Sequence, residues 1–314
     1  MKNILVTGGD GFIGAPLVKR LSDSGYCVIA TTRKNHKHKS LNYFRVDIDP
    51  YTDWSNYLDK VDVIIHLAGR AHVVNDSVPD LLSVYRRTNA ESTLNLAMQA
   101  ANHGVKRFIF LSSIKVLGGA GKDEFFNADS PYSPTEPYGV SKMEAEISLL
   151  DLAQTSSIEI IIVRPPLVYG PKVKANFMKL IKLVKSGIPL PFACATNKRS
   201  YISLDNLIDF IITCVNHKDA KNQIFMVSDD LDLSTSELIR RMREILSMRE
   251  NIFFFPKYLL YILFKIIGKK SMFDRLFYSL QIDISKTKTI LNWRPPFGVR
   301  ESLCKTLEMD GHLD

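Results

Sequence analysis

The sequence predicts an α/β fold, with a doubly wound parallel sheet followed by a smaller mixed α/β domain. Apolar runs of strand length recur along the first half of the 314-residue chain, and they are continuous rather than alternating. Continuous runs are typical of parallel strands buried on both faces. The intervals between the runs leave room for crossover helices, which is the spacing of repeated strand–helix–strand units.

The expected strands follow one another in the first half of the chain. They are the segments NILVTG (3–8), CVIATT (27–32), YFRVDI (43–48), VDVIIHLAG (61–69), RFIFLSS (107–113) and IEIIIVRPP (158–166). Crossover helices are expected at 15–24 and 89–103, where helix-forming residues fill the intervals. This alternation of strand and helix is the pattern of a doubly wound sheet.

The second half of the chain has a different pattern. After Pro165 the apolar runs become shorter, and many prolines interrupt them. We therefore expect one domain over 1–166 and a second over 167–314. The two are expected to interleave, and part of 199–230 is the candidate for a return to the first domain.

Composition and cysteine usage indicate the class of protein. Apolar residues make up 46% of the chain and charged residues 24%, which is ordinary for a soluble globular protein. The four cysteines are scattered and form no CxxC pair. This predicts a reducing compartment and argues against zinc or a disulfide framework. No signal-peptide pattern precedes the first strand, so we expect a cytoplasmic protein.

The net charge of +8 is compatible with a solvated lysine-rich surface, part of which faces anionic ligands such as phosphates. Nucleic acid is not an expected partner, because the basic residues are dispersed and no recognised binding module is present. One apolar run, 258–267, contains Lys265 and is too short for a membrane span, which needs about 20 residues. We expect a buried or substrate-capping helix there rather than an interfacial anchor.

Four glycines follow the first expected strand, at Gly8, Gly9, Gly11 and Gly14. The spacing Gly8-x-x-Gly11-x-x-Gly14, between a strand and a helix, is the context that a dinucleotide-binding fingerprint requires. One glycine makes the turn, one admits the pyrophosphate, and one lets the helix pack on the strand. The N-terminus of the helix then offers free N–H groups to phosphate. The pattern predicts a Rossmann-type domain.

Several motifs extend this prediction to a family. TGGDGFIG resembles the glycine motif of the extended, nucleotide-sugar-modifying branch of the short-chain dehydrogenases/reductases, the NAD-dependent epimerase/dehydratase family. HLAG at 66–69 is similar to the loop beside the cofactor, and RPPLVYGP at 164–171 is similar to the exit into the sugar-nucleotide domain. LSS at 111–113 and YGVSK at 138–142 match the catalytic positions. The resemblance covers nearly the whole chain.

The resemblance implies that Ser113, Tyr138 and Lys142 are catalytic. Tyr138 and Lys142 are spaced i, i+4, so they share one face of a helix. A nearby ammonium and a cationic nicotinamide ring favour the phenolate, so we expect the pKa of Tyr138 to be lowered. In the family, Ser113 hydrogen-bonds the reacting oxygen, Lys142 holds the nicotinamide ribose, and hydride passes between the nicotinamide and a carbinol carbon.

The residues that the resemblance assigns to the cofactor come from several loops. They are Gly8, Gly11, Phe12, Ile13, Gly14, Thr32, Arg33, Asp47, Ile48, Leu67, Ala68, Gly69, Asn89, Tyr138, Lys142 and Pro165. NAD-binding members have an acidic residue at the end of the second strand, where this chain has Thr32, followed by the basic run RKNHKHK. Since Arg33 could pair with a 2′-phosphate, NADP(H) is favoured and NAD(H) remains possible. His36 and His38 have no second ligand pair, so no metal is expected.

The reaction is narrowed by residues after Ser113. Sugar 4,6-dehydratases carry an Asp-Glu pair there, whereas this chain has Ile114 and Lys115, so dehydration is not expected. NADPH use favours a reductase, and the second half resembles the 4-ketoreductases of bacterial surface-polysaccharide pathways that form UDP-N-acetylquinovosamine. We therefore expect NAD(P)H-dependent reduction of a UDP-4-keto-6-deoxy-N-acetylhexosamine. The alternative is a UDP-hexose or UDP-N-acetylhexosamine 4-epimerase with bound NAD, and a non-catalytic NADP-sensing protein is a remote one.

The resemblance also implies contacts to a UDP-sugar. The contacting residues are Ser113, Asn176, Arg199 and Arg275. The two arginines would clamp the diphosphate, and surface ion pairing is the alternative role for them. Many relatives have Tyr where this chain has Leu117 and Asn where it has Leu167. Family members often dimerise through helices of the cofactor domain, so a homodimer is possible.

Overall fold

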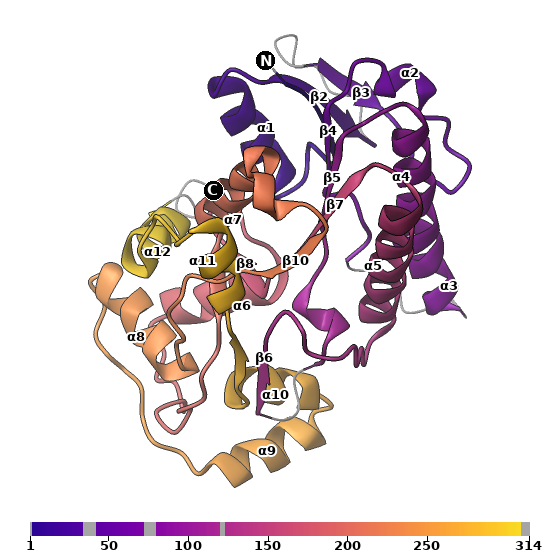
Figure 1. Cartoon of the computed structure of the whole chain (residues 1–314). Helices are drawn as coiled ribbons and strands as arrows, with labels where there is room; N and C mark the ends of the chain where they lie inside the picture. Colours follow the sequence, from indigo (N-terminus) through magenta and orange to yellow (C-terminus); the bar gives the residue numbers. More distant parts are fainter. Residues whose placement is uncertain (1, 34–41, 72–79, 120–122, 309–314) are drawn as a thin grey trace.

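A seven-stranded parallel sheet forms the centre of the computed structural model, which describes residues 2–33, 42–71, 80–119 and 123–308 (Figure 1). Its strands are β1 (Asn3–Thr7), β2 (Cys27–Thr32), β3 (Asn42–Arg45), β4 (Val63–His66), β5 (Arg107–Leu111), β7 (Glu159–Arg164) and β10 (Gln223–Met226). They lie in the order β10-β7-β5-β4-β1-β2-β3, and every pair is parallel. The predicted fold class is confirmed, and each expected strand is present.

Helices cover both faces of this sheet, as Figure 1 shows. Ile4 and Val6 of β1 are buried against one face, where α1 (Gly14–Asp23) and α7 (Leu204–Asn216) pack. Leu5, between them, belongs to the opposite core with α4 (Ser92–Asn102) and α5 (Pro137–Thr155). Because successive side chains of a strand point to opposite faces, burial on both faces requires the continuous apolar runs seen in the sequence.

The helix expected over 89–103 differs from the prediction at its beginning. It is preceded by α3 (Leu81–Arg86), whose first turn is capped by the Asp80 side chain, and by the π-helical turn η1 (Arg87–Glu91). Such turns insert an extra residue into a helix and often occur at functional sites. Here the turn contains Asn89, which is fully buried.

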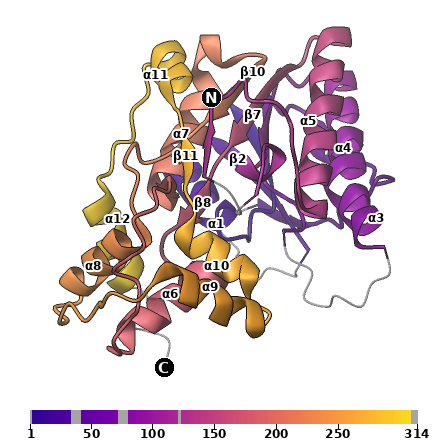
Figure 2. The ribbon, with the colours of Figure 1, turned by 90° about the horizontal axis from the view of Figure 1, so that it is seen from below.

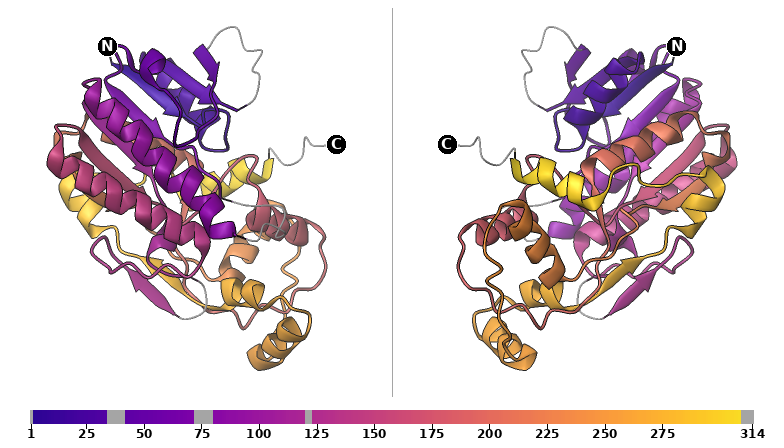
Figure 3. Two further views of the ribbon diagram at one scale, coloured as in Figure 1. Left: turned by 90° about the vertical axis from the view of Figure 1, so that its right-hand side faces the viewer. Right: turned by 90° about the vertical axis from the view of Figure 1, so that its left-hand side faces the viewer.

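A second core lies beside the sheet (Figures 2 and 3). It is formed mainly by α6 (Ala175–Lys185), α8 (Thr235–Ile245), α10 (Lys270–Phe277) and α12 (Val299–Glu308). Of two small parallel pairs, β8 (Leu167–Tyr169) with β9 (Tyr201–Ser203) contributes Tyr169 and Tyr201 to this core. The other pair, β6 (Glu124–Phe126) with β11 (Leu280–Ile282), packs on the core of the sheet. The shorter helices are α2 (Ser55–Leu58) and α11 (Ser285–Leu291). The sheet with the helices that cover it is the first body of the molecule, and the elements around the second core are the second body. The two bodies lie side by side.

The chain passes between the two bodies more than once. After β9 it forms α7, whose buried residues pack on the sheet, and then β10, which pairs with β7 at the edge of the sheet. From 233 it enters the second core, and Ile284, Leu291 and Trp293 lie in the core of the sheet again. Residues far apart in the sequence therefore hold the two bodies together.

The apolar run near 258–267 forms a surface helix, α9 (Lys257–Ile266). Only Leu260 is buried, while Ile262, Leu263 and Ile266 are 48%, 51% and 77% exposed. Of the two expectations for this segment, the buried helix is therefore wrong, and the substrate-capping helix stays a prediction. Tyr261 and Phe264 pack against the second core, and the rest of the apolar surface faces outward because no other described element covers it. None of the described helices combines the length and the apolar character that a bilayer crossing requires.

Candidate functional site

The glycine loop makes a close turn between β1 and α1. Gly8 has φ +69°, and a Cβ on it would lie 3.1 Å from the backbone of Ala68 in the loop after β4. A Cβ on Gly14 would collide with the carbonyl oxygen of Gly8. Glycine at these two positions therefore lets the turn form and lets α1 begin directly beside the strand.

Gly11 occupies the open side of the same loop. A Cβ there would meet a single neighbouring atom, the Gly8 carbonyl oxygen, at 3.1 Å, so the side facing away from the loop is free space. The beginning of α1 has no side-chain cap and no acidic residue in its first turn. Its first N–H groups and partial positive charge are therefore available to an anion.

A groove of about 350 Å³ lies at the carboxyl ends of β1, β2 and β4. The order of the strands reverses between β1 and β4, and the crevice at such a switch point is where doubly wound sheets bind ligands. The groove is lined by these residues assigned to the cofactor from sequence: Gly8, Gly11, Thr32, Arg33, Asp47, Ile48, Leu67, Ala68 and Gly69.

Sequence reasoning missed other residues of this groove, namely Asp10, Thr31, Val46, Arg70 and Thr88. Thr31 lies near the end of β2, and Val46 directly follows β3. The positions of the strand ends could have found these two, because the carboxyl ends of parallel strands share one edge of the sheet. No comparable pattern marks Thr88, which reaches the groove from the π turn.

The remaining residues expected at the cofactor lie around the groove rather than on its wall. Phe12 packs against both hydrophobic cores, and Ile13 directly precedes α1. The carbonyl of Pro165 accepts a hydrogen bond from the Ile114 N–H at 3.0 Å, which ties the end of β7 to the loop after β5. Gly14 lies beneath the loop, against Gly8.

The end of β2 has the arrangement on which cofactor choice was predicted. Thr32 is buried, and its carbonyl accepts a hydrogen bond from Val46 N–H at 2.9 Å. Arg33 is exposed on the groove, and Asp47 lies exposed on the same wall. The rest of the basic run, including His36 and His38, lies outside the described residues.

Asn89 fastens the loop after β4 to helix α5. Its side-chain oxygen accepts from Arg70 N–H at 2.7 Å, and its amide donates to the Arg70 carbonyl and to Ser141 Oγ, both at 3.0 Å. The π turn places this side chain inward, which an uninterrupted α-helix would not do at the same position. Asn89 therefore fixes Gly69, on the groove, relative to the helix of Tyr138 and Lys142.

Tyr138 and Lys142 lie in the first two turns of α5, as their spacing predicts. Gly139 allows this helix to approach the turn η2 (Ile114–Val116), since a Cβ on it would lie 2.5 Å from the Lys115 carbonyl oxygen. This contact brings the Tyr138 hydroxyl into a hydrogen bond with the Ser113 side chain. The catalytic residues expected from sequence therefore converge at the end of β5.

The electrostatics of this cluster differ from the prediction. Burial raises the pKa of Tyr138 to about 12, although the hydrogen bond from Ser113 acts in the opposite direction. Burial also lowers the pKa of Lys142 to about 7, so that its ammonium is a weaker partner for a phenolate. The expected lowering of the tyrosine pKa is absent in the protein alone, because desolvation outweighs the hydrogen bond with Ser113.

Lys142 lies beside Gly69, which lines the groove. Its Nζ lies 4.0 Å from the centre of the Phe110 ring, and it would be 3.8 Å from a Cβ on Gly69. The neighbouring His66 was not expected as a site residue. Burial, with Lys142 nearby, lowers the pKa of His66 to about 3, so the imidazole is neutral. It is hydrogen-bonded to Thr7 Oγ1 at 2.7 Å and Thr93 Oγ1 at 2.9 Å, which holds β1, β4 and α4 in register.

Arg199 and Arg275 lie close enough to interact electrostatically. Burial, together with repulsion from Arg275, lowers the pKa of Arg199, whose guanidinium also donates to the Tyr278 carbonyl at 3.0 Å. In the described part of the chain, neither arginine forms a salt bridge with a carboxylate. Two close cations of this kind suit a dianionic group. Asn176, by contrast, is exposed near the beginning of α6.

The fold and this cluster define the chain as a dinucleotide-dependent enzyme of the extended short-chain dehydrogenase/reductase class. Residues 4–228 match the "NAD dependent epimerase/dehydratase family". The chain belongs to this family, and the predicted resemblance is confirmed.

Individual relatives of the chain are nucleotide-sugar epimerases and dehydratases. Over 98% of this chain and 95% of its own length, a "UDP-glucose 4-epimerase" of Vibrio cholerae is 44% identical. A UDP-glucuronic acid 4-epimerase of Bacillus cereus, solved with NAD, is 24% identical with a TM-score of 0.79, covering 99% of this chain and 97% of its own. A dTDP-glucose 4,6-dehydratase of Bacillus anthracis, also with NAD, is 19% identical with a TM-score of 0.77, covering 100% and 98%. The shared fold therefore does not separate epimerases from dehydratases.

Proposed function

We propose that this protein is a UDP-hexose 4-epimerase, acting on UDP-glucose or a UDP-N-acetylhexosamine, that keeps NAD bound. The observation that carries the proposal is the 44% identity, over 98% of the chain, with the Vibrio cholerae protein named as a UDP-glucose 4-epimerase. The comparisons favour this reaction over the 4-ketoreductase that the sequence motifs suggested. Lys115, where dehydratases carry a carboxylate, supports the exclusion of dehydration and forms a salt bridge with Glu136 at 3.0 Å.

The residues present fit a bound dinucleotide. Gly11 leaves open space where any larger residue would place a side chain, and α1 begins without a cap or an acidic residue. Ala68 and Gly69 line the groove, and Lys142 Nζ would lie 3.8 Å from a Cβ on Gly69. NAD, when bound, supplies the acceptor and donor of hydride at its nicotinamide ring.

The side chains of the cluster then have separate roles. Tyr138 takes the proton from the sugar hydroxyl as hydride leaves the same carbon, and returns it when hydride comes back to the opposite face of the ketone. Ser113 holds the Tyr138 hydroxyl and the reacting oxygen in one hydrogen-bonded group. Lys142 lies beside the groove, and the positive charge of a bound nicotinamide would favour the Tyr138 phenolate against the burial that raises its pKa in the protein alone.

The arginine pair supports the assignment of the substrate end. We propose that Arg199 and Arg275 bind the diphosphate of the UDP-sugar, because their mutual repulsion in the free protein is relieved by a dianion. Asn176, which is exposed near the beginning of α6, is proposed to contact the same nucleotide sugar. Leu167, at the position where many relatives have Asn, is 38% exposed.

The test of the reaction uses purified protein without added cofactor. We expect conversion of UDP-glucose or UDP-N-acetylglucosamine to the C4 epimer, observed by NMR, and release of about one NAD per chain on acid denaturation. The Tyr138→Phe variant is the control that keeps the cofactor and loses conversion. Absence of conversion, together with NADPH oxidation that depends on a UDP-4-keto-6-deoxy-hexosamine, would replace the epimerase by the reductase.

That reductase is the second candidate, and one observation favours it. Thr32 stands where NAD-binding members have a ribose carboxylate, and Arg33 lies exposed on the groove beside it. A 2′-phosphate would meet a cation there instead of an anion. If this candidate holds, Arg33→Ala weakens NADPH roughly 10- to 150-fold and leaves NADH almost unchanged.

A further inference from the structure

The outer surface of α9 and the strand-like segment before it form an apolar face with no covering element among the described residues. Its exposed members are Phe253 (44%), Phe254 (71%), Tyr258 (65%), Leu259 (38%), Ile262 (48%), Leu263 (51%), Ile266 (77%) and Ile267 (51%). We call these residues the α9 face. A helix of a globular protein normally turns its apolar stripe toward the core, so an exposed stripe of this size marks an interaction surface.

The charged residues within the segment that forms the α9 face are all of one sign, whereas the carboxylates Glu250 and Asp274 flank this segment. Between Asn251 and Phe273 the sequence contains four lysines and no aspartate or glutamate. Lys265, Lys269 and Lys270 are exposed, and in the part of the chain that the structure describes none of them has a salt-bridge partner. The face is thus apolar, aromatic at one end and basic at the other.

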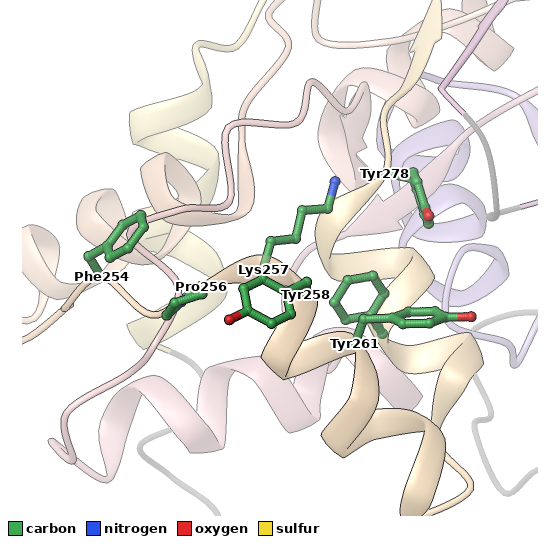
Figure 4. A pocket seen from close by; sticks show the side chains of 7 residues that line it. Phe254, Pro256, Lys257, Tyr258, Tyr261 and Tyr278 are labelled. Atoms are coloured by element: carbon green, nitrogen blue, oxygen red, sulfur yellow. The ribbon is translucent and has the colours of Figure 1, made fainter.

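A groove of about 590 Å³ opens beside the α9 face (Figure 4). The residues that line it include Phe254, Pro256, Tyr258, Tyr261 and Tyr278. The Lys257 ammonium lies 4.9 Å from the centre of the Tyr278 ring. The groove continues the apolar surface of the α9 face, and Lys257 is the charged residue in its lining.

We propose that the α9 face docks on the surface of a membrane that contains anionic lipids. Apolar and aromatic side chains flanked by lysines are the features of helices that lie in the interface between lipid headgroups and acyl chains. In Figures 1 and 3, α9 is the outermost element at the bottom of the molecule, so that a flat surface can reach it. This inference concerns where the protein binds, and it does not depend on the reaction proposed above.

A second copy of the chain is a less suitable occupant. In a two-fold symmetric dimer the same patch meets itself, so the lysines of one copy would face the lysines of the other. The segment 251–273 has no carboxylate to neutralise them. A lipid surface of opposite charge has no such conflict.

The proposal is tested by co-sedimentation of the full chain with lipid vesicles. One set is phosphatidylcholine alone, and the other is an equimolar mixture of phosphatidylcholine and phosphatidylglycerol. Three lysines near an anionic surface predict partitioning onto the mixed vesicles that is roughly 100-fold stronger than onto phosphatidylcholine. Raising the salt concentration should weaken the difference, because salt screens exposed charges.

Two variants separate the apolar and the basic contributions. Ile262→Glu/Ile266→Glu should reduce partitioning onto both vesicles by at least about tenfold. Lys269→Glu/Lys270→Glu should remove most of the preference for the mixed vesicles. Ile188→Glu is the matched control, because Ile188 is an exposed isoleucine (50%) outside the α9 face, and it should bind as the wild type does. All these positions are exposed, so unchanged circular dichroism is expected.

Three outcomes overturn the proposal. In the first, the wild type remains in the supernatant with both kinds of vesicle. In the second, the Ile188 variant loses binding as completely as the Ile262/Ile266 variant. In the third, light scattering shows a dimer that Ile262→Glu/Ile266→Glu converts to a monomer while vesicles bind neither protein, which assigns the face to a second copy.

Discussion

Tyr138 and Lys142 lie about one helical turn apart, and burial moves their pKa values apart, raising that of the phenol and lowering that of the ammonium. The Tyr138 phenol, with a pKa raised to about 12, keeps its proton at neutral pH in the protein alone. The Lys142 ammonium, with a pKa lowered to about 7, loses its proton readily. The cofactor and substrate must therefore change this local field before the tyrosine acts as a base.

The tyrosine tests the proposed chemistry most directly. We expect Tyr138→Phe to lower turnover by about 10² to 10⁴, because one positioned acid/base is lost while the groove remains intact. Turnover measured by NMR of the sugar product and NAD content measured after denaturation check the two parts separately. Turnover near the wild-type rate would rule out the assigned role.

The lysine gives a prediction about stability and pH. The unfolded chain holds the Lys142 proton up to its ordinary pKa of 10.5, whereas the folded protein releases it near 7. Below about pH 7 both states are protonated and the folded state bears the full cost of a buried ammonium, and this cost disappears as the pH rises toward 10.5. We expect Lys142→Met to be more stable than the wild type at about pH 6, with the gap closing at about pH 10. Urea denaturation of NAD-free protein measures it, and a gap that does not change with pH would contradict the cause given.

In the turn between β1 and α1, Gly11 is needed for cofactor binding and Gly14 is needed for folding. Gly11→Val should keep the fold and lose NAD, because the added side chain enters the groove. Gly14→Val should instead disrupt packing, since even a Cβ collides with the Gly8 carbonyl. Thermal unfolding and NAD content distinguish the two variants. A Gly11→Val protein with a full complement of NAD would refute the role of this position.

Helix α5 is joined to strand β7 by a buried ion pair. Arg164 contacts Glu146 at 2.6 Å, with both side chains almost fully buried, and Arg164 also donates to the Ala128 carbonyl at 3.2 Å. Arg164→Met should cost about 3–5 kcal/mol of unfolding free energy, because it leaves a buried carboxylate unpaired. The double variant Arg164→Met/Glu146→Leu should recover part of this loss. Equal stability of the single and double variants in urea would show that the charge left behind is not the cause.

The sequence predicted an element correctly where its pattern of residues is compatible with one kind of structure. Continuous apolar runs predicted β1 to β5 and β7, and the i, i+4 spacing placed Tyr138 and Lys142 together. The π turn at Asn89 could not be predicted, because it depends on hydrogen bonds to Arg70, a residue that is adjacent only in the folded chain. The exposure of α9 was missed for a related reason, since its pattern specifies a helix without specifying what covers it.

At the scale of the whole molecule, the two bodies meet at the proposed cofactor and substrate sites. Phe12, beside the groove, belongs to both cores, and Tyr278 accepts the Arg199 hydrogen bond next to the α9 groove. Binding of NAD to the folded state alone should therefore stabilise the whole chain. At a free concentration of 100 times its Kd we expect about 2.7 kcal/mol, measured as a higher urea midpoint than that of NAD-free protein. Equal midpoints would mean that the cofactor also binds the unfolded chain or does not bind at all.

The return of the chain to the sheet has a consequence for how the protein is made. Strand β10 completes the edge of the sheet beside β7, yet it lies about sixty residues further along the chain than β7 does. During synthesis β7 emerges before β10. Its edge stays unpaired until the residues between the two strands, which include α6 of the second body, have also emerged. A fragment that stops after β7 would keep that apolar edge uncovered and would associate with other strands. We therefore expect the nascent chain to be most prone to aggregation at the stage where β7 has formed and β10 has not yet emerged.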